Sequence, residues 1–370
     1  MIRSRFAPSL VALALLAGAA RADVATLTAV RDNTLFNDPA GALSNGSGPV
    51  MIVGRAGGAS TAPVRRGVLR FDIAAAIPPG ATIQSAQLVL ANPSGNSGAR
   101  TVELHRLLQD WGEGASNTTS GQGAAAEPGD ATWLNTFFPG ALWSSPGGAF
   151  EAAVSSQQVV DAFGVYTWPS TPLAVSDVQG WLDQPANNFG WLLKLDVETV
   201  SQSTKVFGTR EASDPSEHPK LVVSFDPPPV FTYCTARTSS LGCTPAIGWS
   251  GTPSASAGAG FAVTLSQTLN RKPGVLVYGL SGPAATPFLG GTLCVAPPLR
   301  RSAFLWTGGS ASGADCSGSL ALDFNARIAS GVDPALVAGA VVHAQWLTRD
   351  PGNAAGSFNS SDALRFAIAP

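Results

Sequence analysis

The stretch Val68-Leu69-Arg70-Phe71-Asp72-Ile73 alternates apolar and charged side chains from Leu69 onward. Successive side chains of a β-strand point to opposite faces, so this period of two predicts a half-buried strand. Further short segments share the period and are bounded by Gly, Pro, Asn or Ser: 86–90, 101–105, 220–225, 261–265, 275–278, 320–324 and 364–368. Many short strands at regular spacing predict an all-β fold, here two jelly-roll-like β-sandwich domains in tandem.

Two segments depart from this strand pattern. Val178, Trp181 and Leu182 are spaced i, i+3, i+4, which predicts a helix over 176–182. Residues 112–147 are rich in Gly, Ala, Ser, Asn and Pro, and this composition predicts a long loop excursion.

The clearest domain boundary is Asp226-Pro227-Pro228-Pro229. Consecutive prolines cannot continue a sheet ladder and favour an extended spacer. Residues 23–226 carry 11 basic against 19 acidic side chains, net −8, whereas residues 231–370 carry 8 against 5, net +3. We therefore expect one domain at 23–226, a linker at 227–230 and a second domain at 231–370.

Residues 1–22 have the features of a secretory signal peptide. Arg3 and Arg5 precede a short apolar run, and Ala20-Arg21-Ala22 resembles a cleavage site. The alternative is an uncleaved anchor, but the apolar run is short for a bilayer and no later stretch reaches about 18 apolar residues. We expect a secreted, extracellular protein whose mature chain has no transmembrane segment.

Composition excludes two broad classes of protein. Hydrophobic residues make up 45% of the chain, which excludes a disordered polymer. The net charge of −2 and a pI near 5.9 exclude a broadly basic protein, so no nucleic-acid partner is expected.

All four cysteines follow the proposed linker, at Cys234, Cys243, Cys294 and Cys316. An even number in an exported chain indicates two disulfides, for which three connectivities exist. Proximity in the sequence favours Cys234–Cys243 and Cys294–Cys316. The alternative, a zinc site, lacks the usual C-x-x-C spacing.

Sequence motifs of common enzyme classes are missing. The chain has no nucleophile elbow, no zinc-protease motif and no phosphate-binding loop. Asp110 and Glu113 flank Trp111 and could form the carboxylate pair of a glycosidase, but a strand end that enters a loop is the simpler explanation for them. His105 is best explained as a structural strand residue.

Tryptophan is abundant, with nine residues in the chain. An indole face can stack on the C–H groups of a sugar ring. Most tryptophans are expected in the core. Trp133 and Trp143 fall in the loop-rich segment 112–147, so we expect these two rings to be the better exposed candidates for sugar binding.

Longer motifs give residues 25–226 a family resemblance. Residues 68–73, 77–83 and 85–90 together resemble the central signature of the DNRLRE domain. Further matches follow in the family's order: Asp32, Asn45-Gly46, 51–54, 110–113, 131–133, 178–182, 188–191, 207–211 and 218–223. Each motif is degenerate, but their order makes the resemblance fairly specific.

Members of that family are exported, non-catalytic β-sandwich modules, and some bind acidic polysaccharides such as alginate. The resemblance therefore implies binding to an extracellular polysaccharide, or to a matrix or cell-surface component. The positions that match the family's lettered residues are Asp32, Asn45, Arg66, Leu69, Arg70 and Glu211.

Two roles stay open for the charged residues among these. One is an Arg70–Glu211 ion pair crossing the sandwich. In a strand Arg210 and Glu211 would point to opposite faces. The other is ligand binding, in which guanidinium groups bind a uronate carboxylate. The candidate ligand-binding residues are Arg66, Arg70, Trp133, Trp143, Arg210 and Glu211.

The acidic surplus of the first domain suggests a second kind of site. Asp32, Asp38 and Asn45 lie in or beside Gly-rich loops and offer the hard oxygen ligands that calcium prefers. Their spacing matches no ordered calcium loop, so calcium is an optional cofactor and no other is expected.

Residues 231–370 resemble a terminal module of exported multidomain bacterial proteins, which implies no activity. The chain as a whole is predicted to be a secreted, non-catalytic polysaccharide- or matrix-binding protein. One alternative is a structural surface component without glycan affinity. The other is a polysaccharide hydrolase or lyase whose cleft converges on Asp110, Glu113 and His105.

Overall fold

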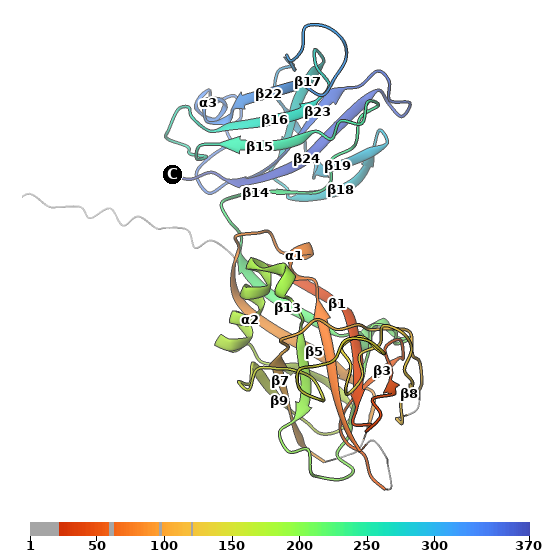
Figure 1. Cartoon of the computed structure of the whole chain (residues 1–370). Helices are drawn as coiled ribbons and strands as arrows, with labels where there is room; N and C mark the ends of the chain where they lie inside the picture. Colours follow the sequence, from red (N-terminus) through yellow and green to blue (C-terminus); the bar gives the residue numbers. More distant parts are fainter. Residues whose placement is uncertain (1–21, 59–62, 96–97, 120) are drawn as a thin grey trace, which may run out of the picture. The chain divides into compact units, whose positions relative to one another are not determined.

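The computed structural model describes residues 22–58, 63–95, 98–119 and 121–370 (Figure 1). Strands make up 43% of the protein and helices 8%, which confirms the all-β prediction. The described residues form two compact units, Ala22–Tyr233 and Cys234–Pro370. The proposed signal peptide lies outside the described residues except for Ala22. Among the described residues, no helix has the length and apolar character needed to span a bilayer.

The described residues of the first unit form fourteen strands, whose bounds are β1 Asp23–Phe36, β2 Leu43–Ser44, β3 Val50–Arg55, β4 Val64–Phe71, β5 Thr82–Asn92, β6 Ser94–Gly95, β7 Arg100–Arg106, β8 Ala124–Ala125, β9 Ser156–Val160, β10 Gly164–Trp168, β11 Trp191–Leu195, β12 Lys205–Gly208, β13 Lys220–Asp226 and β14 Val230–Tyr233. The helices are α1 Ile73–Ala76 and α2 Pro172–Asp183, with 3₁₀ turns at Pro185–Asn187 and Pro215–Glu217.

The long strand β1 belongs to both layers of the first unit. Its first half pairs with β13, and after a register shift between Ala29 and Arg31 its second half pairs with β4. The strand order is β10-β5-β13-β1-β4-β11-β7-β9, all antiparallel, and β3, β12 and β6 join beside β4. A bulge bends a strand and increases its twist, so β1 turns the sheet back on itself.

The core of the first unit lies between the two halves of this curled sheet. Its residues follow the predicted alternation, as in β13, where Leu221, Val223 and Phe225 are buried between half-exposed neighbours. The predicted helix is confirmed and extends over α2, where Thr171 caps the first turn and accepts a hydrogen bond from the backbone N–H of Ala174.

The predicted loop excursion is also confirmed: β8 is the only strand among the residues of 112–147 that the structure describes. The excursion folds back over the outer face of β1, β4 and β11. A second, smaller apolar cluster forms there from Leu35, Val68, Leu107, Trp111, Ala131, Trp143, Ala149 and Leu192. The prediction that β4 is half-buried was therefore wrong at Val68, which is fully buried on this second face.

The second unit contains ten strands and one helix, with bounds β15 Ala246–Ser250, β16 Ala262–Thr268, β17 Pro273–Gly279, β18 Pro283–Phe288, β19 Gly291–Val295, β20 Arg300–Arg301, β21 Leu305–Trp306, β22 Gly318–Asp323, α3 Phe324–Ala329, β23 Val341–Arg349 and β24 Phe358–Ala367. One sheet has the order β24-β23-β17-β20, with β21 also on β17, a second is β15-β16-β22, and β18 pairs with β19. Phe261, Phe324 and Phe366 stack edge-on in its core, with adjacent ring centroids 4.9 Å apart.

Two disulfides close the second unit, but the predicted pairing was wrong. The bonds are Cys234–Cys294 and Cys243–Cys316, which span 60 and 73 residues. Residues 239–243 form a tight turn, in which the backbone N–H of Ser239 donates to the carbonyl of Cys243 at 2.8 Å. The Cα atoms lie 6.3 Å apart in the Cys234–Cys294 pair and 5.5 Å apart in the Cys243–Cys316 pair, so the tertiary fold, rather than distance along the chain, selects the partners. Disulfides persist in oxidising compartments.

His343 on β23 makes the stability of the second unit dependent on pH. His343 is only 5% exposed. Burial lowers the pKa of its imidazole to about 4, with a smaller contribution from the charge of Arg365. An unfolded histidine has a pKa of about 6.5, so the neutral form is favoured by folding. The resulting stabilisation is present above pH 6.5 and is lost as the pH falls through 4.

We expect His343→Leu to remove this acid sensitivity. Between pH 7 and pH 4 the wild type loses about 3 kcal/mol more unfolding free energy than the variant, because each pKa unit corresponds to about 1.4 kcal/mol. Urea unfolding at both pH values measures this difference. Equal losses in the two proteins would contradict the assignment.

Candidate functional site

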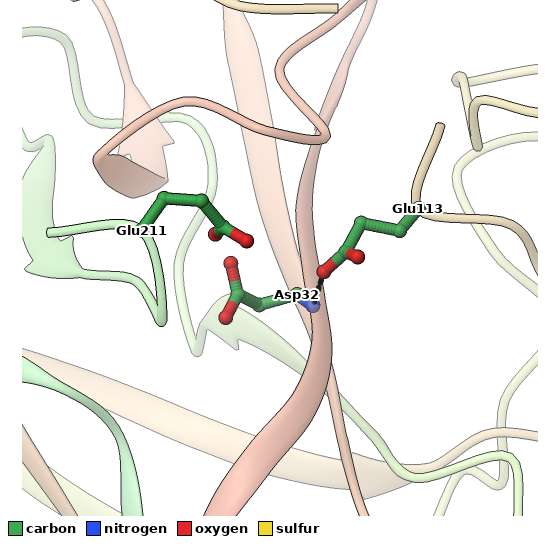
Figure 2. A group of neighbouring side chains, drawn as sticks. All are labelled: Asp32, Glu113 and Glu211. Atoms are coloured by element: carbon green, nitrogen blue, oxygen red, sulfur yellow. Dashed lines mark hydrogen bonds between the residues drawn. The ribbon is translucent and has the colours of Figure 1, made fainter. Parts of the chain in front are cut away.

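Charged side chains from three distant segments of the first unit meet at one place. Asp32 comes from β1, Glu113 from the loop excursion and Glu211 from the turn after β12 (Figure 2). One carboxylate oxygen of each lies within 4.8 Å of the other two. The curl of the sheet and the folded-back loop excursion bring these segments together.

Asp32 is the most buried of the three, with no exposed surface. Its Oδ2 accepts a hydrogen bond from the backbone N–H of Arg210 at 3.0 Å, and its own N–H donates to Glu113 Oε1 at 2.8 Å. Its Oδ1 is buried without a hydrogen-bond partner among the described residues. Burial raises the pKa of Asp32 well above its usual value, and the charges of Glu211 and Glu113 raise it further.

Arg210 is the only cation in direct contact with these carboxylates among the described residues. Its Nε donates a hydrogen bond to Glu113 Oε1 at 2.8 Å, and its Nη2 donates one to Glu113 Oε2. Its Nε also lies 2.9 Å from Glu211 Oε1, while Glu211 Oε2 is buried and has no partner in the described part of the chain. Three carboxylates against one guanidinium leave a charge of −2 when all are ionised.

A second group of charged residues consists of Arg31 on β1, Arg70 on β4 and Asp110. Arg31 and Arg70 are directly opposite in the β1–β4 register, where like charges repel. Asp110 Oδ1 lies between them, 3.2 Å from Arg31 and 3.6 Å from Arg70. Burial lowers the pKa of Arg70, and the charge of Arg31 lowers it further.

A polar pocket of about 230 Å³ opens beside Arg70, lined by Arg70, Asp72, Pro185 and Asn188. Asn188 Nδ2 donates to the carbonyl of Phe71 at 2.7 Å, whereas its Oδ1 is buried without a partner among the described residues. The pocket is therefore lined by a cation, a carboxylate and an amide side chain. Groups of this kind bind hydroxyl and carboxylate groups of a ligand.

Two of the predicted ligand-binding residues have structural partners instead. Arg66 forms a two-bond ion pair with Glu198, at 2.9 and 2.7 Å, and its guanidinium covers the ring of Trp133. The expected exposure was wrong for Trp143, which is only 5% exposed and donates its indole N–H to the carbonyl of Thr132. Both rings lie where the loop excursion packs back on the sheet.

The predicted Arg70–Glu211 ion pair was also wrong. Arg70 pairs with Asp110, and Glu211 pairs with its neighbour Arg210. The prediction assumed that residues 210 and 211 lie in a strand, where adjacent side chains diverge. They lie in a turn, which lets both side chains reach the same place.

The predicted calcium ligands do not form one group. Asp38 accepts a hydrogen bond from Ala42 N–H at 2.8 Å, within its own turn. Asn45 Nδ2 donates a hydrogen bond to the carbonyl of Val50, and Asn45 Oδ1 accepts one from the backbone N–H of Thr118. Of the predicted set only Asp32 belongs to the acidic group. Glu113 and Glu211 had been singled out in the sequence for other roles, and no spacing relates them to Asp32.

His105 does not join Asp110 and Glu113. Its ring nitrogens lie 2.9 Å from the carbonyl of Glu151 and 3.2 Å from Glu103. It is buried between neighbouring strands, as the structural explanation predicted.

No protein-family model matches the chain, and no curated protein matches it. Among solved structures, similarity is found to the β-glucuronidase of Parabacteroides merdae with glycerol in its active site. The match covers 90% of this chain and 35% of that chain, with 9% identity and a TM-score of 0.16. So low a TM-score supports no conclusion about fold or function.

Proposed function

We propose that the chain is a secreted, non-catalytic protein whose first unit binds an extracellular acidic polysaccharide through the pocket beside Arg70. The observation that supports this proposal is that the hydrogen-bond donors of the Arg70 guanidinium are unused in the described part of the chain. It makes one ion pair, at 3.6 Å, and no hydrogen bond with any described residue. An arginine fork binds a carboxylate with two parallel hydrogen bonds, so its free donors suit a uronate group.

The other walls of the pocket fit the rest of a sugar unit. The exposed Asp72 carboxylate can accept a hydrogen bond from a hydroxyl group, and Pro185 offers an apolar surface to ring C–H groups. The volume of about 230 Å³ is below the range of about 300–1,000 Å³ that is usual for small-molecule sites. It suits one residue of a polymer that continues across the surface.

Secretion is part of the proposal and is supported by the two disulfides and by the features of residues 1–22. The resemblance to the DNRLRE domain supports the non-catalytic role. The net charge of −8 of residues 23–226 disfavours a broad anion-binding surface, so recognition is assigned to one local pocket.

Affinity electrophoresis of the full mature chain through gels with alginate, pectin, xylan or no glycan tests this proposal. We expect retardation by the two uronate polymers. Arg70→Gln is expected to weaken it about tenfold or more, since a hydrogen bond to a charged group contributes about 1.5–3 kcal/mol. Arg100→Gln is the matched control, because Arg100 is also a half-buried arginine but does not line the pocket.

Two results would contradict the proposal. One is a folded wild type that no glycan retards, which would favour a structural surface component. The other is equal retardation of the Arg70→Gln and Arg100→Gln variants.

A further inference from the structure

We propose that Asp32, Glu113 and Glu211 form a binding site for one calcium ion, which joins β1, the loop excursion and the turn after β12. This site is separate from the glycan pocket and does not depend on it. It also differs from the ligand set expected from the sequence, of which only Asp32 remains.

The geometry of the three carboxylates fits one ion. Calcium binds six to eight oxygen atoms at about 2.3–2.6 Å, so two ligands of one ion lie at most about 5 Å apart. The three oxygens here are all within 4.8 Å of one another. With only three protein ligands, water molecules would complete the coordination.

Two buried oxygen atoms in this group lack a partner. Asp32 Oδ1 and Glu211 Oε2 are both without hydrogen bonds among the described residues, and Asp32 has no exposed surface. Figure 2 shows the carboxylates of Asp32 and Glu211 facing each other. A buried carboxylate oxygen without a donor is costly, and a cation that contacts both of these oxygens removes this cost.

The charge of the group selects a divalent cation. Arg210 offsets one of the three carboxylates, which leaves −2. Carboxylate oxygens alone suit calcium or magnesium better than zinc, which favours nitrogen and sulfur ligands. Calcium is favoured over magnesium because it tolerates irregular coordination, whereas magnesium needs near-ideal octahedral geometry at about 2.0–2.1 Å.

A calcium ion bound at this site would also order the segment around Asp110, the ion-pair partner of Arg70. Glu113 is three residues from Asp110, and Asp32 follows Arg31, which shares Asp110. A bound ion therefore holds both ends of the Arg31–Asp110 contact in place.

Thermal unfolding of the full mature chain, first treated with chelator and then titrated with CaCl₂, tests the site. Extracellular calcium sites have dissociation constants of about 10⁻⁴–10⁻³ M, so 5 mM CaCl₂ is expected to raise the melting temperature of the first unit by about 3–6 °C. Isothermal titration calorimetry is expected to give one calcium per chain. MgCl₂ and ionic-strength-matched NaCl are expected to have little effect.

Asp32→Asn and Glu211→Gln are expected to abolish the calcium response while keeping the fold. In chelator both should melt at or above the wild-type temperature, because each removes one of two facing charges. Asp183→Asn is the matched control, since it removes an exposed carboxylate at the end of α2 and should leave the response intact.

Three results would overturn the calcium site: a folded wild type that calcium does not stabilise, an equal response to NaCl, or an unchanged response in Glu211→Gln. Stabilisation by mild acid without any calcium response would show that Asp32 and Glu211 share a proton instead. None of these results depends on glycan binding, so failure of the calcium site and failure of the proposed function are distinguishable.

Discussion

Trp191→Ala is expected to lower the unfolding free energy of the first unit by about 4 kcal/mol. Trp191 begins β11, between β4 and β7, and is 1% exposed. Its ring packs edge-on against Trp181, with centroids 4.7 Å apart, and its indole N–H donates to Asp177 Oδ2 at 2.8 Å. Truncating a buried tryptophan typically costs about 3–5 kcal/mol, because the remaining cavity closes only in part.

The lost indole N–H adds to this effect. Asp177 is 7% exposed and also accepts a hydrogen bond from Ser155 Oγ. Trp191→Phe retains a ring and removes the donor, so we expect it to cost less than the alanine variant, about 2 kcal/mol. The difference between the two variants separates the cavity from the hydrogen bond.

Urea unfolding followed by circular dichroism measures these losses. Phe163→Ala is the control, because Phe163 is 72% exposed and surface substitutions usually change stability by less than about 0.5 kcal/mol. A loss below about 1 kcal/mol for Trp191→Ala would mean that the Trp181–Trp191 pair is not part of a close-packed core.

Removing the Cys243–Cys316 disulfide by a double substitution to alanine is expected to cost about 4 kcal/mol. The bond closes a loop of 73 residues, and in the chain-entropy description the stabilisation grows with the logarithm of loop length. Cys243 is 2% exposed, so alanine replaces the buried sulfur without adding a polar group.

The same variant distinguishes the observed pairing from the pairing of sequence neighbours. If Cys234 and Cys294 are bonded, the unfolded double variant has no free thiol in a thiol titration. If neighbours were bonded, two free thiols would remain. Mass spectrometry of unreduced wild-type peptides is expected to show the links Cys234–Cys294 and Cys243–Cys316, and a Cys234–Cys243 link would refute this connectivity.

The strands were predictable because their signal is local. In β13 the alternation of Leu221, Val223 and Phe225 with half-exposed neighbours follows directly from the pleat of a strand. The helix α2 was predictable for the same reason, from the spacing of Val178, Trp181 and Leu182. The loop excursion follows from its Gly- and Pro-rich composition.

The candidate site was predictable only in part. Asp32, Arg70, Glu113 and Glu211 were all singled out in the sequence, but which of these residues meet was not predicted. Glu113 reaches Asp32 because an excursion of irregular backbone folds over β1, and Glu211 reaches it because residues 210–211 form a turn. Neither feature leaves a periodic signal, and the same loop buries Trp143, which its sequence context had suggested was exposed.

The sequence by itself thus determined the all-β class, the strand positions, the helix and the residue types available for chemistry, since these depend on neighbours along the chain. Only the tertiary structure decided which cysteines pair, which carboxylates meet and which arginine keeps free donors. The disulfides depend on the fold of the second unit, and the other two outcomes depend on the register shift in β1 and on the path of the loop excursion. Both bring together residues that lie tens to more than a hundred positions apart, beyond the reach of any local pattern.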